Sequence, residues 1–275
     1  MFWQWCLIVC GLILCSAKTN LSISDNQVYP AVCRSAASDE EAFAHFKRHS
    51  IYNLIHEYTT FEEGTAYLEE IARAYPDLLG QIERFRQNDR LGDPKTFDYG
   101  SIGTLSPSTL RYIKIAGDLR RAFGDLTGMK VIEIGGGYGG QCKILSDLFA
   151  FESYTIVDLP ESLALARTYL DKLGVAGVRF LSPKELSDKE SCDLVISHYG
   201  ISEYDRPLQK RLLERVVAHA KKSYLVCTSY PRHFRIKPLG KEDLLKQLKT
   251  LGLSYQILPE EPLMGKNHFI IKIEH

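Results

Sequence analysis

Five glycines lie within the six residues from Gly135 to Gly140, directly after the short apolar segment MKVIEI. An apolar run of this length and composition is typical of a buried strand, and the residues 141–149 have the character of a helix. Glycines at a strand-to-helix turn let the backbone approach a ligand closely, and the N-terminus of the helix presents N–H groups to that ligand. The segment therefore predicts a strand–turn–helix unit that binds a ligand.

Strand-like and helix-like segments alternate from Met129 to the C-terminus. The predicted strands are 129–135, 153–159, 177–181, 192–197, 223–229, 254–258 and 268–273. The predicted helices between them are 141–149, 161–173, 207–220 and 241–251. Such alternation is typical of a mostly parallel sheet covered by helices, and the last two strands are close enough for an antiparallel ending.

The part of the chain before this sheet divides into three. Residues 1–17 form an apolar leader, and residues 18–105 read as a helical region that ends in a long loop rich in Gly, Pro, Asp and Ser. Ser106-Pro107 then has the pattern of a helix start, with Ser106 as the N-cap. We therefore expect the α/β domain to span residues 106–275.

The leader, MFWQWCLIVCGLILCSA, admits three interpretations. It ends in small residues like a signal peptide, but no Lys or Arg precedes Lys18. It is slightly shorter than the roughly 20 apolar residues of a membrane span. A lipoprotein signal would have a small residue before Cys15, where this chain has Leu14. We expect membrane association or export through residues 2–17, and cleavage stays open.

Composition excludes some classes of function. The 34 Lys and Arg residues balance the 34 Asp and Glu residues, and no basic run occurs, which argues against a nucleic-acid partner. The seven cysteines show no CxxC spacing, and no dense group of carboxylates and histidines occurs. We therefore predict no metal site.

The glycine run fits two templates. Gly135, Gly137 and Gly140 fit the GxGxxG turn of dinucleotide sites, whereas Gly135, Gly137 and Gly139 fit the GxGxG turn of class I methyltransferases. Glu133, two residues before the first glycine, favours the second template. A carboxylate there attracts the positive sulfonium and amino group of S-adenosylmethionine, but it would repel a pyrophosphate.

Asp158 is the second candidate anchor, because it ends the second strand 23 residues after Gly135. An acid at this position can accept hydrogen bonds from both ribose hydroxyls of a bound nucleoside. The alternative role is a cap for the helix that begins near Pro160.

Four segments carry a family resemblance: NDRLGDP (88–94), SPSTLRYIKIAGDL (106–119), VIEIGGGYGGQ (131–141) and SHYGISEY (197–204). From about Tyr29 onward the chain resembles the bacterial sugar O-methyltransferases. The resemblance implies a Rossmann-like seven-stranded methyltransferase sheet with an N-terminal helical cap, S-adenosyl-L-methionine as cofactor, and a sugar hydroxyl as substrate. Where the family has Ser-Asn-Tyr, this chain has Ser197-His198-Tyr199.

On these grounds we assign a set of residues to the cofactor site. They are Glu133, Gly135, Gly136, Gly137, Tyr138, Gly139, Gln141, Asp158, Leu159 and Ser197.

A base would assist methyl transfer to a hydroxyl, and it should project from the carboxyl ends of the strands. The loop after the fourth strand offers His198 and Glu203. His198 is the first choice because imidazole is neutral at physiological pH, and the alternative is a histidine that only positions the loop. Glu203 could instead be an acid that favours the N-terminus of a helix.

Two other functions stay open at this point. One is a nicotinamide-dependent oxidoreductase on the same kind of sheet, and the other is a protein that binds cofactor without turnover. Because S-adenosylmethionine is made in the cytosol, an uncleaved leader would be consistent with a catalytic domain that faces the cytoplasm. The acceptor is expected to be a small molecule or glycan.

Overall fold

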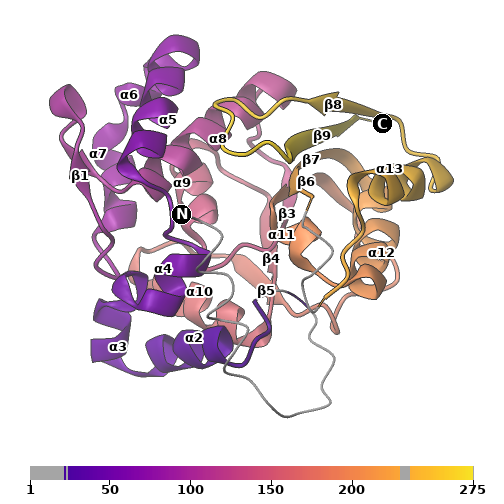
Figure 1. Ribbon diagram of the computed structural model, residues 1–275, viewed down its shortest axis with the longest axis horizontal. Helices are drawn as coiled ribbons and strands as arrows, with labels where there is room; N and C mark the ends of the chain where they lie inside the picture. The colour runs from indigo at the N-terminus through magenta and orange to yellow at the C-terminus, as the bar shows by residue number, and fades with distance from the viewer. Residues whose placement is uncertain (1–21, 23, 230–235, 275) are drawn as a thin grey trace.

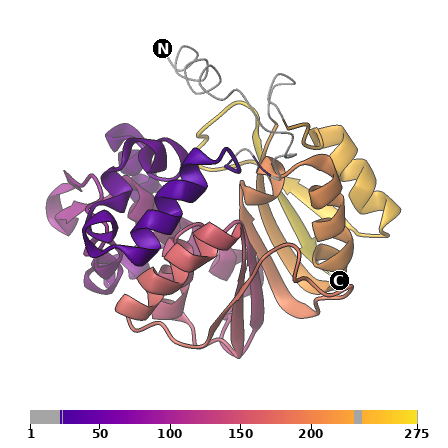
Figure 2. The ribbon, with the colours of Figure 1, turned by 90° about the horizontal axis from the view of Figure 1, so that it is seen from below.

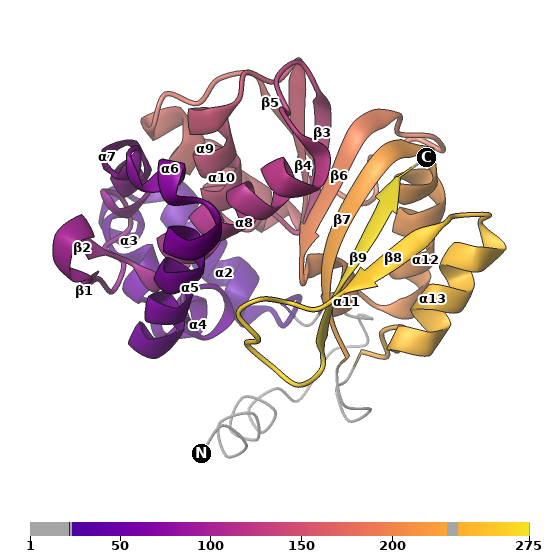
Figure 3. The ribbon, with the colours of Figure 1, turned by 90° about the horizontal axis from the view of Figure 1, so that it is seen from above.

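The computed structural model describes residues 22, 24–229 and 236–274. A seven-stranded sheet with the order β5-β4-β3-β6-β7-β9-β8 forms the centre of the fold (Figures 1 and 3). Its strands are β3 (Lys130–Ile134), β4 (Ser153–Val157), β5 (Val178–Leu181), β6 (Cys192–His198), β7 (Ala220–Thr228), β8 (Tyr255–Leu258) and β9 (His268–Glu274). The first five are parallel, and β9 is antiparallel to both β7 and β8. The predicted Rossmann-like, mostly parallel seven-stranded sheet and its antiparallel ending are confirmed.

The order of the strands reverses at β3, which lies between β4 and β6. In open sheets of this kind, ligands bind beside the carboxyl ends of the strands at such a reversal. Glu133 pairs in register with Ile156 on one side and with Ile196 on the other. The acid therefore lies near the end of the central strand, where the crevice opens.

Helices cover both faces of the sheet, and each face has its own apolar core. On one face lie α8 (Pro107–Phe123), α9 (Gly140–Leu148) and α10 (Pro160–Lys172), and their buried residues share a core with the N-terminal helices. On the other face lie α11 (Gly200–Glu203), α12 (Arg206–Arg215) and α13 (Lys241–Thr250). The helices predicted at 141–149, 161–173, 207–220 and 241–251 agree with α9, α10, α12 and α13 to within one residue at each end, with one exception. The α12 helix ends earlier, at Arg215, and a 3-10 turn (Val217–His219) leads into β7.

The N-terminal helices form the predicted helical cap, which lies beside the sheet on the side of α8 and α10 (Figure 2). They are α2 (Val28–Ser38), α3 (Glu40–Ala44), α4 (Ser50–Ile55), α5 (Phe61–Ala74), α6 (Pro76–Leu79) and α7 (Ile82–Phe85). The α2 helix packs on α10, and α5 packs on α8. Through these contacts the cap forms one wall of the crevice.

The segment predicted as a long loop before α8 is partly ordered. It holds a small hairpin of β1 (Phe97–Asp98) and β2 (Thr104–Leu105), whose strands are joined by a 3-10 turn (Gly100–Ile102), and another 3-10 turn (Arg86–Asp89) precedes it. Asp89 accepts hydrogen bonds from the backbone N–H and hydroxyl of Ser106 and from the hydroxyl of Thr109. Ser106 caps α8 by accepting from the N–H of Thr109 at 3.1 Å, as predicted. Sequence periodicity missed the hairpin because each of its strands has only two residues.

Within the described ranges, no helix is long and apolar enough to cross a membrane. The apolar residues 1–17 lie outside the described residues, so the leader remains a prediction.

Candidate active site

A pocket opens where the carboxyl ends of β3, β4 and β6 face the helical cap. Seven of the residues assigned from the sequence line it. They are Glu133, Gly135, Gly136, Gln141, Asp158, His198 and Glu203. The cap and α8 contribute Tyr29, His56, Tyr58, Arg111 and Tyr112, and the segment around α11 contributes Tyr199, Gly200 and Tyr204. The fold thus brings the two predicted acids, the first glycines and both candidate bases to one cavity.

Glu133 is a buried carboxyl group, with 3% of its surface exposed. The phenol of Tyr154 donates a hydrogen bond to its Oε2 at 2.9 Å. Burial raises the pKa of Glu133 to about 7, and nearby Asp158 adds to the rise. Among the described residues, no cationic side chain lies within ion-pair distance of this carboxyl group. A cationic ligand group would therefore supply the charge partner that the protein withholds.

Asp158 is held by the glycine turn itself. Its two oxygens accept hydrogen bonds from the backbone N–H of Gly137 at 2.8 Å and of Leu159 at 2.7 Å. Burial raises its pKa to about 6, although both hydrogen bonds oppose the rise. The side chain does not cap α10, whose N-cap is Leu159 without a side-chain bond. Asp158 therefore joins β4 to the turn and faces the pocket.

Two of the glycines are required by close contacts. Gly135 has φ of +77°, and a Cβ there would lie 2.7 Å from the Cα of Gly200. Gly137 has φ of +56°, and a Cβ there would lie 2.7 Å from the imidazole of His56. The turn thus approaches the end of β6 on one side and the cap on the other, and only glycine permits both contacts.

We expect Gly135→Ala to lower the free energy of unfolding by about 1–3 kcal/mol more than Gly174→Ala does. Both glycines have positive φ, +77° and +70°, so both changes carry the same backbone cost. Only at Gly135 would the new Cβ meet another backbone, since nothing lies within 4 Å at Gly174. Chemical denaturation of the two variants measures the difference, and equal losses would contradict the close approach.

Five assigned residues lie outside the pocket lining: Gly137, Tyr138, Gly139, Leu159 and Ser197. The hydroxyl of Ser197 donates to the carbonyl of Ile134 at 2.8 Å and accepts from the N–H of Ile201 at 2.9 Å. These bonds join the end of β3 to the start of α11. Ser197 therefore positions two elements that line the pocket without lining it itself. Direct contact of these five residues with the cofactor remains a prediction.

Tyr138 points away from the pocket into the cap. Its ring lies 4.4 Å from the Nζ of Lys47, which is fully buried and also donates to the carbonyl of Asn88 at 2.7 Å. Burial lowers the pKa of Lys47. The tyrosine in the glycine run therefore fastens the turn to the helical cap, which accounts for an aromatic residue among glycines.

Gln141 has an unused acceptor. Its Nε2 donates to the carbonyl of Tyr112 at 3.2 Å, whereas its buried Oε1 has no hydrogen-bond partner among the described residues. Buried polar atoms are rarely left without a partner. Because Gln141 lines the pocket near Glu133, its Oε1 is available to an N–H donor of a ligand.

His198, at the end of β6, is a second pocket residue with an unpartnered polar atom. Its Nε2 is buried and has no hydrogen-bond partner among the described residues. Burial, with the charges of Arg111 and Lys114, lowers the pKa of the imidazole to about 3. The ring is therefore neutral at physiological pH and able to accept a hydrogen bond. Glu203 lies on the same wall, at the end of α11.

His56 lines the pocket, although it was not assigned to the site from the sequence. Its Nε2 is 2.7 Å from the phenol oxygen of Tyr29. Burial lowers its pKa to about 3. The sequence carried no local signal for this role, because His56 follows the short α4 helix and meets the turn only through the packing of the cap. Arg111 was also missed, although it lies within SPSTLRY, a segment that carried the family resemblance.

Comparison with known proteins finds that this chain is similar to several methyltransferases. No protein-family model matches it. A protein-L-isoaspartate O-methyltransferase from Pyrococcus horikoshii is 25% identical over 156 residues, which are 54% of this chain and 68% of that protein.

Two similar solved structures are also methyltransferases by name. The mitomycin 7-O-methyltransferase MmcR is 17% identical with a TM-score of 0.45, and the match covers 60% of this chain and 56% of that one. The magnesium protoporphyrin IX methyltransferase ChlM from Synechocystis PCC 6803, with bound SAH, is 15% identical with a TM-score of 0.47. That match covers 71% of this chain and 95% of the other. The chain thus spans little more than half the length of MmcR.

Proposed function

We propose that this chain transfers a methyl group from S-adenosyl-L-methionine to a hydroxyl oxygen, and that the acceptor is a sugar or glycan precursor. The observation that carries the proposal is the pair of buried carboxyl groups, Glu133 and Asp158, beside the glycine turn of one pocket. The cofactor offers a cationic sulfonium, an ammonium group and two ribose hydroxyls. These are the groups that buried carboxylates attract and bind by hydrogen bonds.

Four polar residues of the pocket have a part in this proposal. Glu133 and the open Oε1 of Gln141 hold the amino-acid end of the cofactor, and Asp158 accepts hydrogen bonds from the ribose. When bound, S-adenosylmethionine supplies an electrophilic methyl group. The neutral His198 lies on the same wall, where its Nε2 can accept the hydrogen bond of an acceptor hydroxyl. Orientation of this kind can contribute about 7–11 kcal/mol to such a reaction.

A nicotinamide dinucleotide fits the same pocket less well. Its pyrophosphate would lie at the glycine turn, where Glu133 would repel it once ionised. We expect calorimetry on the full chain to show binding of S-adenosylhomocysteine and none of NAD. The reverse preference would end the methyltransferase proposal. Transfer of a labelled methyl group to an acceptor would then separate an enzyme from a protein that only binds the cofactor.

The affinity for S-adenosylhomocysteine should depend on pH. The pKa values of Glu133 and Asp158 are raised to about 7 and 6, so both groups hold protons below those values. As the pH rises through this range the unliganded protein loses the stability that the protonated carboxyl groups provide, and the ammonium group of S-adenosylhomocysteine offsets this loss when it binds beside the ionised carboxylates. We expect affinity to increase from pH 5.5 to 8, by up to about tenfold per unit for each group below its pKa. Calorimetry across this range measures the effect, and Glu133→Gln should remove the part near pH 7. An affinity that falls as the pH rises would contradict this account.

The leader at residues 1–17 supports a proposal about location. We propose that it holds the protein at a membrane without cleavage and leaves the catalytic domain on the cytoplasmic side, where S-adenosylmethionine is made. Fractionation of cells that express the full chain tests this, together with protease treatment of sealed membranes whose cytoplasmic face is outward. A catalytic domain that is protected inside these membranes would contradict it.

A further inference from the structure

Arg111 projects from α8 into the wall between two cavities. One is the main pocket, and the other is a smaller cavity lined also by Tyr67, Lys114 and Glu260. His198 and Tyr199 line both cavities, so the two meet beside the candidate base. Only 8% of the surface of Arg111 is exposed, yet its side chain reaches both spaces.

The guanidinium of Arg111 has few partners. Its Nη2 donates to the carbonyl of His56 at 3.3 Å, and its Cζ lies 5.5 Å and 5.3 Å from the ring centres of Tyr58 and Tyr112. Within the described part of the chain, no carboxylate lies at ion-pair distance from it. A guanidinium has five N–H donors, so most of them remain for a ligand.

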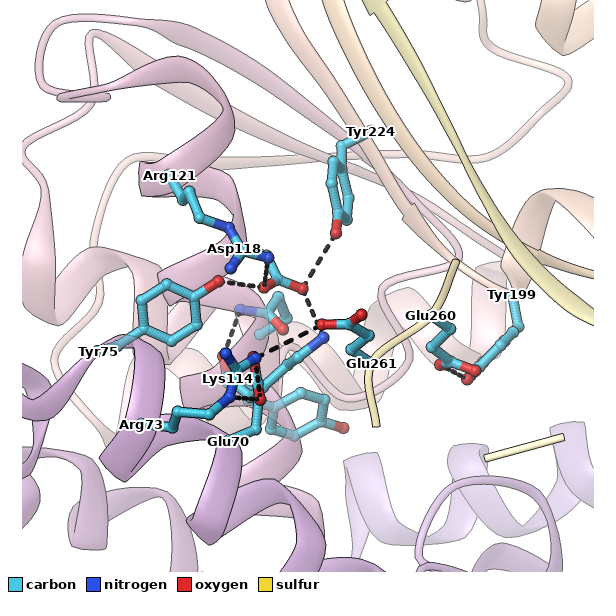
Figure 4. A network of polar contacts seen from close by, with 12 residues as sticks. Glu70, Arg73, Tyr75, Lys114, Asp118, Arg121, Tyr199, Tyr224, Glu260 and Glu261 are labelled. Carbon is cyan, nitrogen blue, oxygen red and sulfur yellow. Dashed lines mark hydrogen bonds and ion pairs between the residues drawn. The ribbon is translucent and has the colours of Figure 1, made fainter. Parts of the chain in front are cut away.

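Two other buried cations, Lys114 on α8 and Lys143 on α9, are each paired with a carboxylate, whereas Arg111 is not. On the same helix, Lys114 donates to Asp118 at 2.7 Å, and Asp118 also accepts from Tyr75 and Tyr224 (Figure 4). Lys143 on α9 is likewise paired with Asp147.

The acid of the smaller cavity is engaged as well. Glu260 accepts hydrogen bonds from the phenol of Tyr199 and, at 2.7 Å, from His268 (Figure 4 shows the first). Neither Asp118 nor Glu260 therefore neutralises Arg111. A buried cation without a partner is costly, which indicates that its partner arrives with a ligand.

We propose that Arg111 binds a carboxylate or phosphate group of the acceptor, so that the enzyme methylates an acidic sugar rather than a neutral one. This inference rests on the proposed methyl transfer and adds the charge of the substrate. The planar guanidinium matches either anion with two parallel hydrogen bonds. Tyr58 and Tyr112 hold it in place by contacts with its faces.

The position of Arg111 favours the acceptor over the carboxylate of the cofactor. The smaller cavity that it lines contains no residue of the glycine turn, and neither Glu133 nor Asp158. It does contain His198, the candidate base to which the proposed function assigns the acceptor hydroxyl. An anionic group held by Arg111 would therefore belong to a molecule that already reaches the candidate base.

The test uses the full chain saturated with S-adenosylhomocysteine, titrated by calorimetry with D-glucuronate, with inorganic phosphate, and with D-glucose as the neutral probe. We expect at least one of the two anions to bind and glucose to bind at least tenfold more weakly. Arg111→Gln should weaken anion binding at least tenfold, and Arg111→Lys should weaken it less. The affinity for S-adenosylhomocysteine should stay within twofold in both variants. Arg120→Gln is the matched control, because it removes the same charge from the same helix at a surface ion pair with Asp77.

The outcomes separate the possible sources of the anion. If Arg111→Gln weakens S-adenosylhomocysteine tenfold and the saturated protein binds no anion, Arg111 holds the cofactor and the inference is wrong. It is also wrong if the wild-type complex binds neither anion, or if Arg120→Gln has the same effect as Arg111→Gln. If S-adenosylhomocysteine itself does not bind, the proposed function fails instead. Melting curves identify a variant that does not fold, in which case Arg111→Lys decides.

Discussion

Asp158→Ala should weaken the binding of S-adenosylhomocysteine by about 1.5–3 kcal/mol, the range for hydrogen bonds to a charged group. That corresponds to roughly 10–150-fold in the dissociation constant. The carboxyl group lines the pocket at the end of β4, where the ribose of the bound nucleoside is expected. An unchanged dissociation constant in calorimetry would remove Asp158 from the site.

The same change should also destabilise the protein, because the carboxyl group serves the turn. Without it, the N–H groups of Gly137 and Leu159 lose their acceptors, at a cost of about 1–3 kcal/mol for each group left buried. Asp205→Ala is the control, since Asp205 caps α12 by accepting from Leu208 and lies outside the pocket. It should lower stability and leave the affinity for S-adenosylhomocysteine unchanged.

The sheet and the two acids could be predicted because their signals are local. Each strand is a short apolar run, and Glu133 and Asp158 lie within two residues of the glycine turn or a strand end. Parallel strands bring their carboxyl ends to one edge, so spacing along the chain determines where such residues meet. The pairing order, with β9 between β7 and β8, was not predicted, because it depends on contacts between distant segments.

The cap side of the pocket could not be predicted in this way. His56 reaches the glycine turn at Gly137, 81 residues further along the chain, only because α2 packs on α10 and α5 packs on α8. No periodicity in a short helix reports such a contact. In the sequence, Arg111 resembles any other charged residue on the polar side of an amphipathic helix. In the structure its helix, α8, is buried on almost every side, and Arg111 with it. Only the absence of a nearby carboxylate, which is a fact of three dimensions, distinguishes it.

A motif also does not separate residues that touch a ligand from residues that hold the turn. Tyr138 and Ser197 belong to the segments that carry the family resemblance, yet one packs on Lys47 and the other bridges β3 and α11. Both side chains stabilise the geometry that Glu133 and Asp158 need. A pattern of residue types records both roles together, and the direction of each side chain is needed to tell them apart.

His198→Gln should lower the rate of methyl transfer at least about tenfold at saturating cofactor, within the range for general bases. The buried Nε2 has no partner in the described structure, so the acceptor hydroxyl can donate to it directly. Since the pKa of the imidazole is about 3, the ring is neutral throughout the physiological range. Protonation of His198 should therefore cause no loss of rate between pH 7 and 5.5, where an ordinary histidine would cause one.

The measurement is transfer of a labelled methyl group to acidic and neutral sugars, with the cofactor affinity determined separately. Glu203→Gln is the matched comparison, because it keeps the size of the side chain and removes the second candidate base from the same wall. A histidine that only positions the loop would behave differently, since its loss would lower the melting temperature and weaken both ligands together. If His198→Gln keeps full turnover and Glu203→Gln abolishes it, the base is Glu203. The buried, unpartnered nitrogen of His198 would then need another explanation, such as a hydrogen bond that orients the acceptor without taking its proton.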